Sequence, residues 1–326
     1  MSSVISISHL SKYYQVSDKS PGLLASVKSF FYRPSRTVKA VDNISFDIDQ
    51  GEFVGFVGPN GAGKTTTLKM LSGLLFPTSG SVSVLGFTPF KRQYSYLRQI
   101  GFIMGQKSQL WWDLPPQETF LLHQAIYHIS EADYRRRLDY FIDILDLGQI
   151  ISVPTKKLSL GQRMKCELVA SLLHQPQVIF LDEPTIGLDI VASQAIRKFL
   201  LDYNRQFHAT IILTSHNLDD VQKLCRRLIV INHGQISYDG DLIKLEKKYH
   251  PQKTLQFIFS HPVKPSDFSK YRSKSFTNPY TLSLTLPPRQ IASATSDILS
   301  HFPVVDINIE STPIETIISR LFTSHD

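Results

Sequence analysis

Hydrophobic positions along the chain follow two periods, and the order of these periods predicts an α/β architecture. Short apolar runs bounded by turn residues predict strands, as in "SVISISHL" (3–10) and "QVIFLDEP" (177–184). Apolar residues spaced three and four apart predict helices, as in "KTTTLKMLSGLL" (64–75) and "QRMKCELVASLLHQ" (162–175). The apolar run that ends at Asp182 is typical of a buried parallel strand. Over roughly the first 240 residues, we therefore expect an α/β domain with a mainly parallel sheet.

The other elements of this domain continue the alternation of strand and helix. We expect further strands at 40–48, 51–58, 79–86 and 210–216, helices over most of 115–150 and at 191–207 and 217–228, and a hairpin at 228–241. Residues 15–38 are expected to be an irregular insertion. Its basic and aromatic residues suit contact with lipid headgroups or with a membrane protein, and they suit a solvated loop equally well.

The pattern changes near residue 245, which predicts a second, smaller unit. Strands and helices then follow one another as expected for a small α+β fold: strands at 254–260, 281–287 and 304–310, and helices at 289–302 and 313–322. We therefore divide the chain into domains 1–244 and 245–326.

Composition leaves several classes of function open. With 326 residues and 42% hydrophobic content, the chain can bury one large core and one small one. The net charge of +7 fits a nucleic-acid binder, a membrane-surface protein or a nucleotide binder, and does not choose among them.

Cysteine spacing and the lack of long apolar segments indicate the compartment in which we expect the protein to work. Cys166 and Cys225 are far apart and lack metal-ligand spacing, which disfavours a disulfide scaffold and indicates a reducing compartment. The N-terminus lacks a signal peptide, and no window approaches the roughly 18–20 apolar residues of a transmembrane helix. We therefore expect any membrane association to go through the surface or through a partner.

The stretch "GPNGAGKTT" (58–66) matches the phosphate-loop pattern G-x-x-x-x-G-K-[ST]. Its glycines, Gly58 and Gly63, let backbone N–H groups close around phosphate oxygens. Lys64 reaches the β- and γ-phosphates and Thr65 coordinates Mg²⁺, while the following helix adds its N-terminal dipole. An ordinary glycine turn is the alternative, and the position between a strand and a helix argues against it.

An acidic pair closes the strand at 177–184. Asp182 can hold Mg²⁺ through water, and Glu183 can polarise an attacking water molecule. Such a pair alone is usually a solvated turn, but its place after a phosphate loop favours the catalytic interpretation.

The stretch "LSLGQ" (158–162) resembles the signature motif of the ABC ATPases, usually LSGGQ. Leu160 replaces the first glycine, and Ser159, Gly161 and Gln162 are kept. The resemblance covers roughly the first 240 residues. Further positions match motifs of the family: Gln106 its Q-loop, Asp189 its D-loop, His216 its switch histidine and Tyr14 its adenine-stacking aromatic. A structural histidine and packing tyrosines (Tyr13 and Tyr14) are the alternatives.

This resemblance implies a P-loop NTPase fold with a RecA-like core, an antiparallel β subdomain and a helical subdomain at about 107–175. It implies ATP and Mg²⁺ as cofactors. The nucleotide ligands would be Tyr14, Asn60, Gly61, Gly63, Lys64, Thr65 and Thr66; the Mg²⁺ ligands Thr65, Gln106 and Asp182; and the hydrolytic residues Glu183, His216 and Gln106. Two domains, as a homodimer or a pseudo-dimer, would close head to tail. Ser159, Gly161 and Gln162 of one copy would then contact the ATP of the other.

Both tryptophans of the chain, Trp111 and Trp112, follow Gln106 and precede two prolines. In the ABC fold this segment enters the helical subdomain, which faces the membrane permease. Trp suits an interface anchor because it contributes a large area with few rotamers. Packing inside the helical subdomain is the alternative, and adjacent residues usually point different ways, so we expect one ring buried and one exposed.

The insertion, "AVDNISF", "GQKSQLWWDLPP" and the C-terminal extension resemble the ATPases of drug, viologen and polysaccharide exporters, whose six-span permeases are separate chains. The resemblance implies an ATP-hydrolysing export subunit at the cytoplasmic face of the membrane, held there by permeases and binding no nucleic acid. Alternatives are an ABC ATPase acting on ribosomes or DNA, an ABC subunit of a non-exporting membrane complex, and a catalytically dead regulatory protein. The last is opposed by the intact Lys64, Asp182, Glu183 and His216.

Overall fold

The computed structural model describes residues 3–17, 35–105, 107–249, 253–311 and 314–323. The chain divides into two compact units, Met1–Gly240 and Asp241–Asp326, and each is described by itself.

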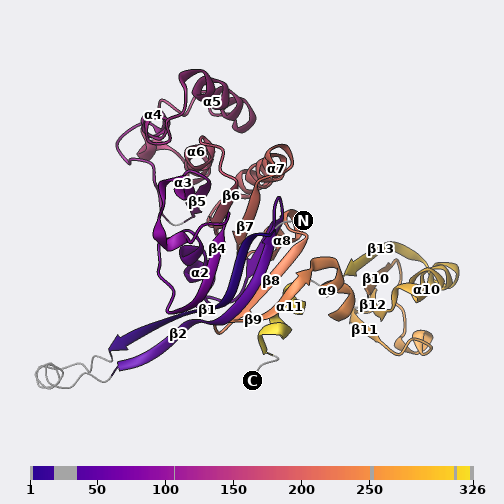
Figure 1. Ribbon diagram of the computed structural model, residues 1–326. Helices are drawn as coiled ribbons and strands as arrows, with labels where there is room; N and C mark the ends of the chain where they lie inside the picture. Colours follow the sequence, from indigo (N-terminus) through magenta and orange to yellow (C-terminus); the bar gives the residue numbers. More distant parts are fainter. Residues whose placement is uncertain (1–2, 18–34, 106, 250–252, 312–313, 324–326) are drawn as a thin grey trace, which may run out of the picture. The chain divides into compact units, whose positions relative to one another are not determined.

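A six-stranded sheet forms the centre of the first unit (Figure 1). Its strand order is β5 (Ile100–Met104), β6 (Val178–Asp182), β7 (Thr210–Thr214), β3 (Phe53–Val57), β8 (Arg227–Asn232) and β9 (Gln235–Asp241). The first five strands run parallel to one another, which confirms the expected mainly parallel sheet. Strand β5 was not predicted, because its short "IGFIM" run contains glycine and lacks a clear period.

An antiparallel sheet packs on this central sheet. It consists of β2 (Ser35–Asp49), β1 (Ser3–Ser17) and β4 (Ser79–Val84), in that order. Ile5 and Ile44 of this sheet belong to the same buried cluster as Phe56 and Phe180 of the central sheet. The two sheets therefore share one hydrophobic core, and the alternation of apolar residues in β1 follows from burial of one face.

The first two strands are longer than the sequence indicated. Residues 15–17 and 35–38 were expected to be irregular, but they belong to β1 and β2 and pair from Gln15↔Thr37 to Ser17↔Ser35. Strand β4 accompanies β1 only as far as Ser11, so the outer part is a two-stranded ribbon. Among the described residues no third strand pairs with this part of the ribbon, and its sequence lacks the alternation that predicts a strand. The rest of the insertion, 18–34, lies outside the described residues.

Helices surround the central sheet. Helices α4 and α5 lie at one end of this unit, and the end of β1 at Ser17 and the start of β2 at Ser35 lie at the other (Figure 1). The helices are α2 (Lys64–Leu71), α3 (Tyr94–Leu97), α4 (Pro116–Ile126), α5 (Glu131–Leu145), α6 (Leu160–Leu172), α7 (Ile190–Phe207) and α8 (Leu218–Leu224). Ser130 caps α5 by accepting a hydrogen bond from the Asp133 N–H, and Asp189 caps α7 in the same way through the Ala192 N–H.

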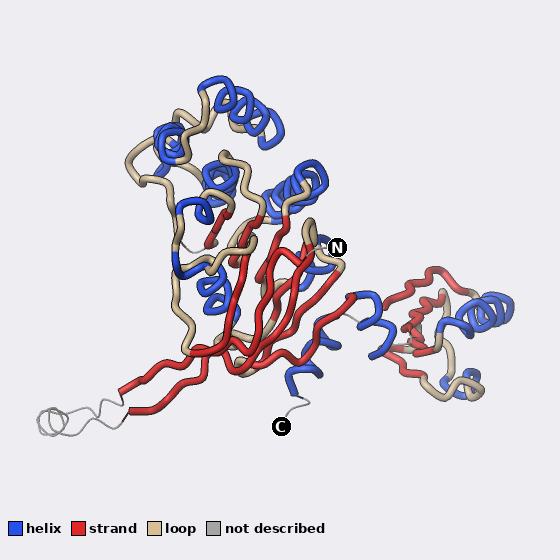
Figure 2. Tube along the Cα trace, in the orientation of Figure 1, coloured by secondary structure: helices blue, strands red, loops and turns tan. Residues whose placement is uncertain are grey.

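The second unit is a four-stranded sheet with a helix packed on one face (Figure 2). Its elements are α9 (Leu242–Tyr249), β10 (Lys253–Phe259), β11 (Lys274–Asn278), β12 (Thr281–Leu286), α10 (Pro288–His301), β13 (Val304–Ser311) and α11 (Ile314–Thr323). Ala294 and Ile298 of α10 pack against Leu255, Phe257 and Leu284. Strand β11 and helix α9 had not been predicted.

Two expectations from composition can be compared with the described residues. Cys166 and Cys225 are free and buried, and burial raises the pKa of the Cys166 thiol to about 12. Within the part of the chain that the structure describes, no helix has the length and apolar character needed to cross a membrane.

Truncation of Phe257, a fully buried residue of β10, should destabilise the second unit. We expect Phe257→Ala to lower its free energy of unfolding by about 3–5 kcal/mol, because a large core side chain is replaced by a cavity. Hydrogen–deuterium exchange of peptides spanning β10 to β12 in the full chain measures this loss. Ile258→Ala, next in sequence but 38% exposed, is the control and should cost less than about 1 kcal/mol. Equal protection in both variants would contradict the assigned core.

Candidate functional site

A cavity of about 870 Å³ lies at the ends of β3 and β6, where the phosphate loop, the acidic pair and the segment after β7 meet. In open α/β sheets this carboxyl edge is the usual ligand site. The lining residues are Gly58, Pro59, Asn60, Gly61, Gly63, Lys64, Thr65, Thr66, Lys69, Met104, Gly105, Lys107, Asp182, Glu183, Ile186 and His216.

The loop between β3 and α2 needs glycine at two positions for different reasons. Gly63 has a φ of 110°, which side chains rarely adopt, and a Cβ there would meet the Ala40 carbonyl oxygen at 2.3 Å. A Cβ on Gly58 would lie 2.2 Å from the Ile231 carbonyl oxygen. Both glycines let the loop approach neighbouring backbone closely. The first residues of α2, Lys64 to Thr66, line the cavity, and N–H groups at a helix N-terminus can bind an anion.

Lys64 is the first residue of α2, and only 6% of its surface is exposed. Its ammonium group donates hydrogen bonds to the carbonyl oxygens of Gly58 (2.7 Å) and Pro59 (3.1 Å). Burial lowers the pKa of Lys64, and the carboxylates of Glu183 and Asp182 oppose that shift. A buried ammonium group facing two carboxylates and a ring of N–H donors suits recognition of a polyanionic phosphate chain.

Asp182 is held by hydroxyl groups from both sides. Thr65 Oγ1 donates to its two carboxylate oxygens at 3.0 and 2.8 Å, and Thr214 Oγ1 donates to Oδ1 at 2.6 Å. The hydroxyl and carboxylate oxygens that converge here are the hard donors that Mg²⁺ prefers. Thr65 and Asp182 therefore fit a Mg²⁺ site. Gln106, the third expected ligand, lies outside the described residues.

Glu183 and His216 are in contact with one another in the wall of the cavity. His216 Nδ1 lies 3.3 Å from Glu183 Oε1. The backbone of Glu183 has a φ of 55°, uncommon for a residue other than glycine. Its N–H donates to the Thr214 carbonyl oxygen at 3.0 Å. A Cβ on Gly105 would lie 2.0 Å from the Glu183 carbonyl oxygen, so the glycine permits this conformation.

The structure brings most of the expected site residues together. Asn60, Gly61, Gly63, Lys64, Thr65, Thr66, Asp182, Glu183 and His216 all line the cavity. Sequence reasoning missed six residues that contribute to its walls: Pro59, Lys69, Met104, Gly105, Lys107 and Ile186. Lys107 adjoins the Q-loop position and Lys69 lies on the helix that follows the phosphate loop, so proximity to the motifs was a signal for both.

The signature residues do not line this cavity. Ser159 is exposed and caps α6: its Oγ accepts from the Gln162 N–H at 3.2 Å, while Gln162 Oε1 accepts from the Ser159 N–H at 2.9 Å. This reciprocal arrangement is a capping box. A Cβ on Gly161 would lie 2.8 Å from Ala192 Cβ, so the glycine allows α6 to approach α7.

Tyr14 also lies outside the residues that line the cavity. It is exposed on β1 and pairs with Val38 on β2, two residues before Ala40, whose carbonyl oxygen faces Gly63. Tyr13, the alternative aromatic, donates from its hydroxyl to Asp42 at 2.5 Å. Tyr14 therefore has the more accessible ring of the two.

Both tryptophans are exposed, so the expectation that one ring would be buried is wrong. Trp111 is 49% and Trp112 is 53% exposed. The loop itself is anchored: the Trp112 carbonyl accepts from the Lys156 N–H at 3.0 Å, and the Arg163 guanidinium lies 5.2 Å from the Trp112 ring centroid. The backbone carbonyl groups of both tryptophans are hydrogen-bonded, Trp111 to the Leu114 N–H and Trp112 to the Lys156 N–H. These bonds hold the loop in place while both rings stay at the surface.

Comparison with known protein families identifies both units. A family model described as ABC transporter matches residues 41–186, and one described as EvrA-like ABC transporter, C-terminal domain, matches residues 251–310. The chain is 32% identical over 231 residues to the ABC transporter ATP-binding protein NatA of Bacillus subtilis, covering 70% of this chain and 92% of that protein.

Other relatives extend over similar lengths. The bacitracin transport ATP-binding protein BcrA of Bacillus licheniformis is 32% identical over 222 residues, covering 68% of this chain and 71% of that protein. The methionine import ATP-binding protein MetN of Geobacillus kaustophilus is 31% identical over 239 residues, covering 72% of this chain and 70% of that protein.

Solved structures agree on the fold. The ATP-binding subunit of an ABC transporter matches with a TM-score of 0.62 and 26% identity, covering 76% of this chain and 93% of that one. A dimeric ATP-binding cassette in a post-hydrolysis state, bound to ADP and Pi, matches with a TM-score of 0.61 and 23% identity, covering 73% of this chain and 98% of that one.

Gly105→Ala should disturb the site without touching a ligand-binding side chain. The added Cβ cannot share space with the Glu183 carbonyl oxygen, so the turn that carries Glu183 must shift. We expect ATP hydrolysis to fall by about a hundredfold, as displacements of about 1 Å can cause, while nucleotide binding persists. Steady-state ATPase assays and binding of a fluorescent nucleotide analogue measure both. The control is Gly148→Ala, where the nearest atom is 4.0 Å away. Normal hydrolysis by Gly105→Ala would argue against a fixed Glu183 turn.

Proposed function

Because the chain belongs to the ATP-binding proteins of ABC transporters and is therefore an ATPase, we propose that it energises export through separate membrane permeases at the cytoplasmic face of the membrane. The observation that carries the hydrolytic part of this proposal is one cavity lined by Lys64, Thr65, Asp182, Glu183 and His216. This cavity therefore brings together residues suited to phosphate binding (Lys64), metal coordination (Thr65 and Asp182) and activation of water (Glu183). The export part rests on the subgroup resemblance.

In the proposed reaction, Glu183 is the general base. It takes a proton from the water molecule that attacks the γ-phosphorus, and the bond to the β–γ bridging oxygen then breaks. His216, in contact with Glu183, orients the γ-phosphate, and Lys64 compensates negative charge on the β- and γ-phosphates. Thr65 and Asp182 would hold Mg²⁺, which neutralises phosphate charge when bound. Gln106 would be its third ligand and would help to orient the water.

A second copy of the ATPase domain would complete this site. Ser159, Gly161 and Gln162 do not line the cavity of their own chain. Ile190 and Val191, which follow the D-loop residue Asp189, are 76% and 77% exposed. These observations support a head-to-tail dimer in which the signature segment of one copy covers the ATP of the other. ATP binding would close the dimer, and hydrolysis would release it.

The surface around Trp111 and Trp112 would bind the permease. Besides the two tryptophans, Leu114 and, on α4, Leu121 and Leu122 are exposed. Apolar side chains gathered on a loop and the adjoining helix are typical of a docking surface, and aromatic residues often dominate the energy of binding. The helical subdomain would in this way receive the cytosolic part of the permease.

The direction of transport is inferred from the subgroup resemblance, because the relatives include both a bacitracin transport protein and a methionine importer. The insertion, the "GQKSQLWWDLPP" segment and the C-terminal extension favour the exporter class. The named relatives are transport proteins, so an ABC ATPase that acts on ribosomes or DNA gains no support. Co-purification of permease chains, as opposed to rRNA or DNA, tests this choice directly.

Glu183→Gln should abolish turnover and leave ATP binding intact, because only the proton-accepting carboxylate is lost. The variant should also accumulate as an ATP-bound dimer, which size-exclusion chromatography detects. Steady-state ATPase assays measure the loss, which should exceed about a hundredfold. Glu131→Gln, which removes a charge from an exposed ion pair with Arg135, is the control and should hydrolyse ATP normally. Near-normal hydrolysis by Glu183→Gln would exclude Glu183 as the base.

Replacing Trp111 and Trp112 together by Ala should uncouple the protein from its permease without unfolding it. Both rings are about half exposed, so the thermal melt and basal ATPase activity should stay close to those of the wild type. Binding to permease in membranes should weaken by about 2 kcal/mol or more, as truncation of interface tryptophans often does. Leu110→Ala, a buried neighbour, provides the contrast and should lower stability by about 2–5 kcal/mol. Full permease binding by the double variant would refute the docking surface.

A further inference from the structure

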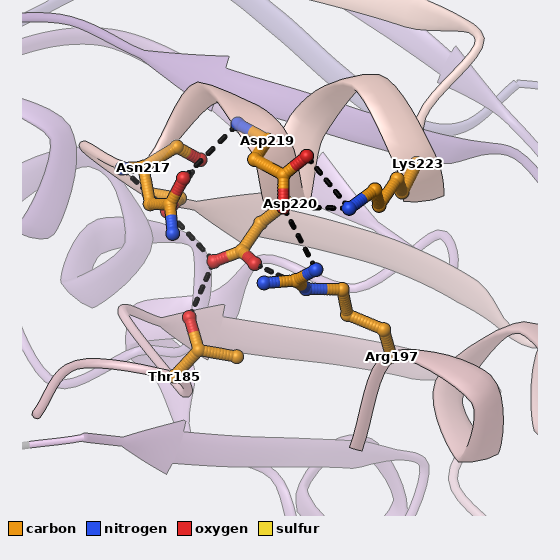
Figure 3. Close-up of polar contacts among 7 residues, drawn as sticks. Thr185, Arg197, Asn217, Asp219, Asp220 and Lys223 are labelled. Atoms are coloured by element: carbon orange, nitrogen blue, oxygen red, sulfur yellow. Dashed lines mark hydrogen bonds and ion pairs between the residues drawn. The ribbon is translucent and has the colours of Figure 1, made fainter. Parts of the chain in front are cut away.

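Asp220 is a fully buried carboxylate that does not line the cavity of the candidate site. It lies in the first turn of α8, four residues after His216 in the sequence (Figure 3). Burying an ionised carboxylate is costly unless charged and polar partners surround it. The identity of these partners indicates what the group does.

Three donors from three separate segments converge on the Asp220 carboxylate. Arg197 of α7 donates from Nε to Oδ1 at 2.6 Å and supplies the counter-charge. Thr185, in the turn after β6, donates its hydroxyl to Oδ2, and Ser215, after β7, donates to the same oxygen at 3.2 Å. Thr185 and Ser215 are each two residues or fewer from a residue of the proposed catalytic site, Glu183 or His216.

The link to Glu183 runs through a tight turn. The Glu183 carbonyl accepts a hydrogen bond from the Ile186 N–H at 3.2 Å, which closes a turn over Glu183 to Ile186. Glu183 has a φ of 55° in this turn, a conformation that needs support from its surroundings when the residue is not glycine. One end of the turn is held by the Thr214 carbonyl, and the hydroxyl of Thr185 ties the other end to Asp220.

The link to His216 runs through the residues on either side of it. Ser215 Oγ accepts from the Asn217 N–H at 3.0 Å, and its one proton is shared between the Asn217 carbonyl oxygen at 3.1 Å and Asp220 at 3.2 Å. Asn217 in turn caps α8, since its side-chain oxygen accepts from the Asp219 N–H at 3.0 Å. The backbone that carries His216 is therefore fixed between the Asp220 carboxylate and the start of α8.

We propose that Asp220 is a positioning residue for hydrolysis: its carboxylate binds Thr185 and Ser215 at once and so sets the separation of Glu183 from His216. Asp220 touches neither the cavity nor the reacting atoms, and Arg197 keeps its charge compensated. This inference rests on the proposed roles of Glu183 and His216. It adds a second link between the turn over Glu183 to Ile186 and the segment of His216, behind the direct contact of Glu183 with His216 at 3.3 Å.

Asp219 and Lys223 extend the contacts of Arg197 toward the surface, where the ion pairs are exposed to water. Arg197 also binds Asp219 at 2.8 Å, and Lys223 binds Asp219 at 2.8 Å (Figure 3). The hydrogen bond from Lys223 is the main reason that the pKa of Asp219 is lowered. Both Asp219 and Lys223 are about half exposed, so water screens their attraction and the pair contributes little to rigidity. The outer pair thus provides a control within the same cluster.

Paired substitutions at Thr185 in the full chain test the proposal. Thr185→Val keeps the shape of the side chain and removes the hydroxyl, whereas Thr185→Ser keeps the hydroxyl and removes the methyl group. We expect Thr185→Val to lower kcat by about tenfold or more with the KM for ATP within about twofold of the wild type, because geometry changes and the phosphate loop does not. Thr185→Ser should restore near-normal kcat. Lys223→Ala should behave as the wild type.

The outcomes separate positioning from packing. Unchanged kcat in Thr185→Val, equal losses in Thr185→Val and Thr185→Ser, or a loss that follows a lowered melting temperature would each overturn the proposal. If Thr185→Val does not fold, Ser215→Ala removes the other hydroxyl link and should show the same kcat loss at constant KM; normal kcat would again refute the role of Asp220. Glu183→Gln, assayed in parallel, separates failure of the proposed catalytic role of Glu183 from failure of the proposed positioning role of Asp220. An active Glu183→Gln variant would refute the catalytic assignment, whereas an inactive one beside a fully active Thr185→Val would refute only the positioning role.

Discussion

The position of the Asp182 carboxylate is the constraint on which the site depends. Parallel pairing of β6 with β7 places Asp182 opposite Thr214, and the hydroxyl of Thr214 binds the carboxylate. On the other side, the hydroxyl of Thr65 ties the same carboxylate to the first turn of α2. The phosphate loop, the acidic pair and the end of β7 are thereby joined at one point, so a shift in the register of these strands would separate residues that must act together.

Two of the charges buried near this point, the Lys64 ammonium and the Asp220 carboxylate, each face an opposite charge. The Lys64 ammonium faces the carboxylates of Asp182 and Glu183, and burial lowers its pKa despite them. Behind the cavity, the fully buried Asp220 carboxylate meets the Arg197 guanidinium. A low dielectric strengthens such pairs and makes an unpaired charge costly. By contrast, the ion pair between Arg135 and Glu131 on α5 is exposed, so water screens its attraction.

Several exposed residues of the first unit are of kinds that partner proteins commonly cover. The signature residue Ser159 is exposed at the start of α6, away from the cavity of its own chain, and Ile190 projects from the start of α7. Trp111 and Trp112 are exposed on a loop with an ordered backbone. Exposure of large apolar side chains to water raises the free energy of the folded chain, and burial of the same side chains against a partner lowers it.

Contiguous motifs in the sequence determined the phosphate loop, the acidic pair, the parallel sheet and the family. Each motif carries its own backbone chemistry: glycine allows the loop at 58–63, and an apolar run ending in acids forms a buried strand with its carboxylates at the edge of the sheet. Tertiary structure alone decided the left-handed turn at Glu183, the extended pairing of β1 with β2, the exposure of both tryptophans and the convergence of Thr185, Arg197 and Ser215 on Asp220. These features arise from contacts between segments that are distant in the chain. Periodicity reports which face of a segment is buried, whereas strand register and helix packing decide which distant residue it meets.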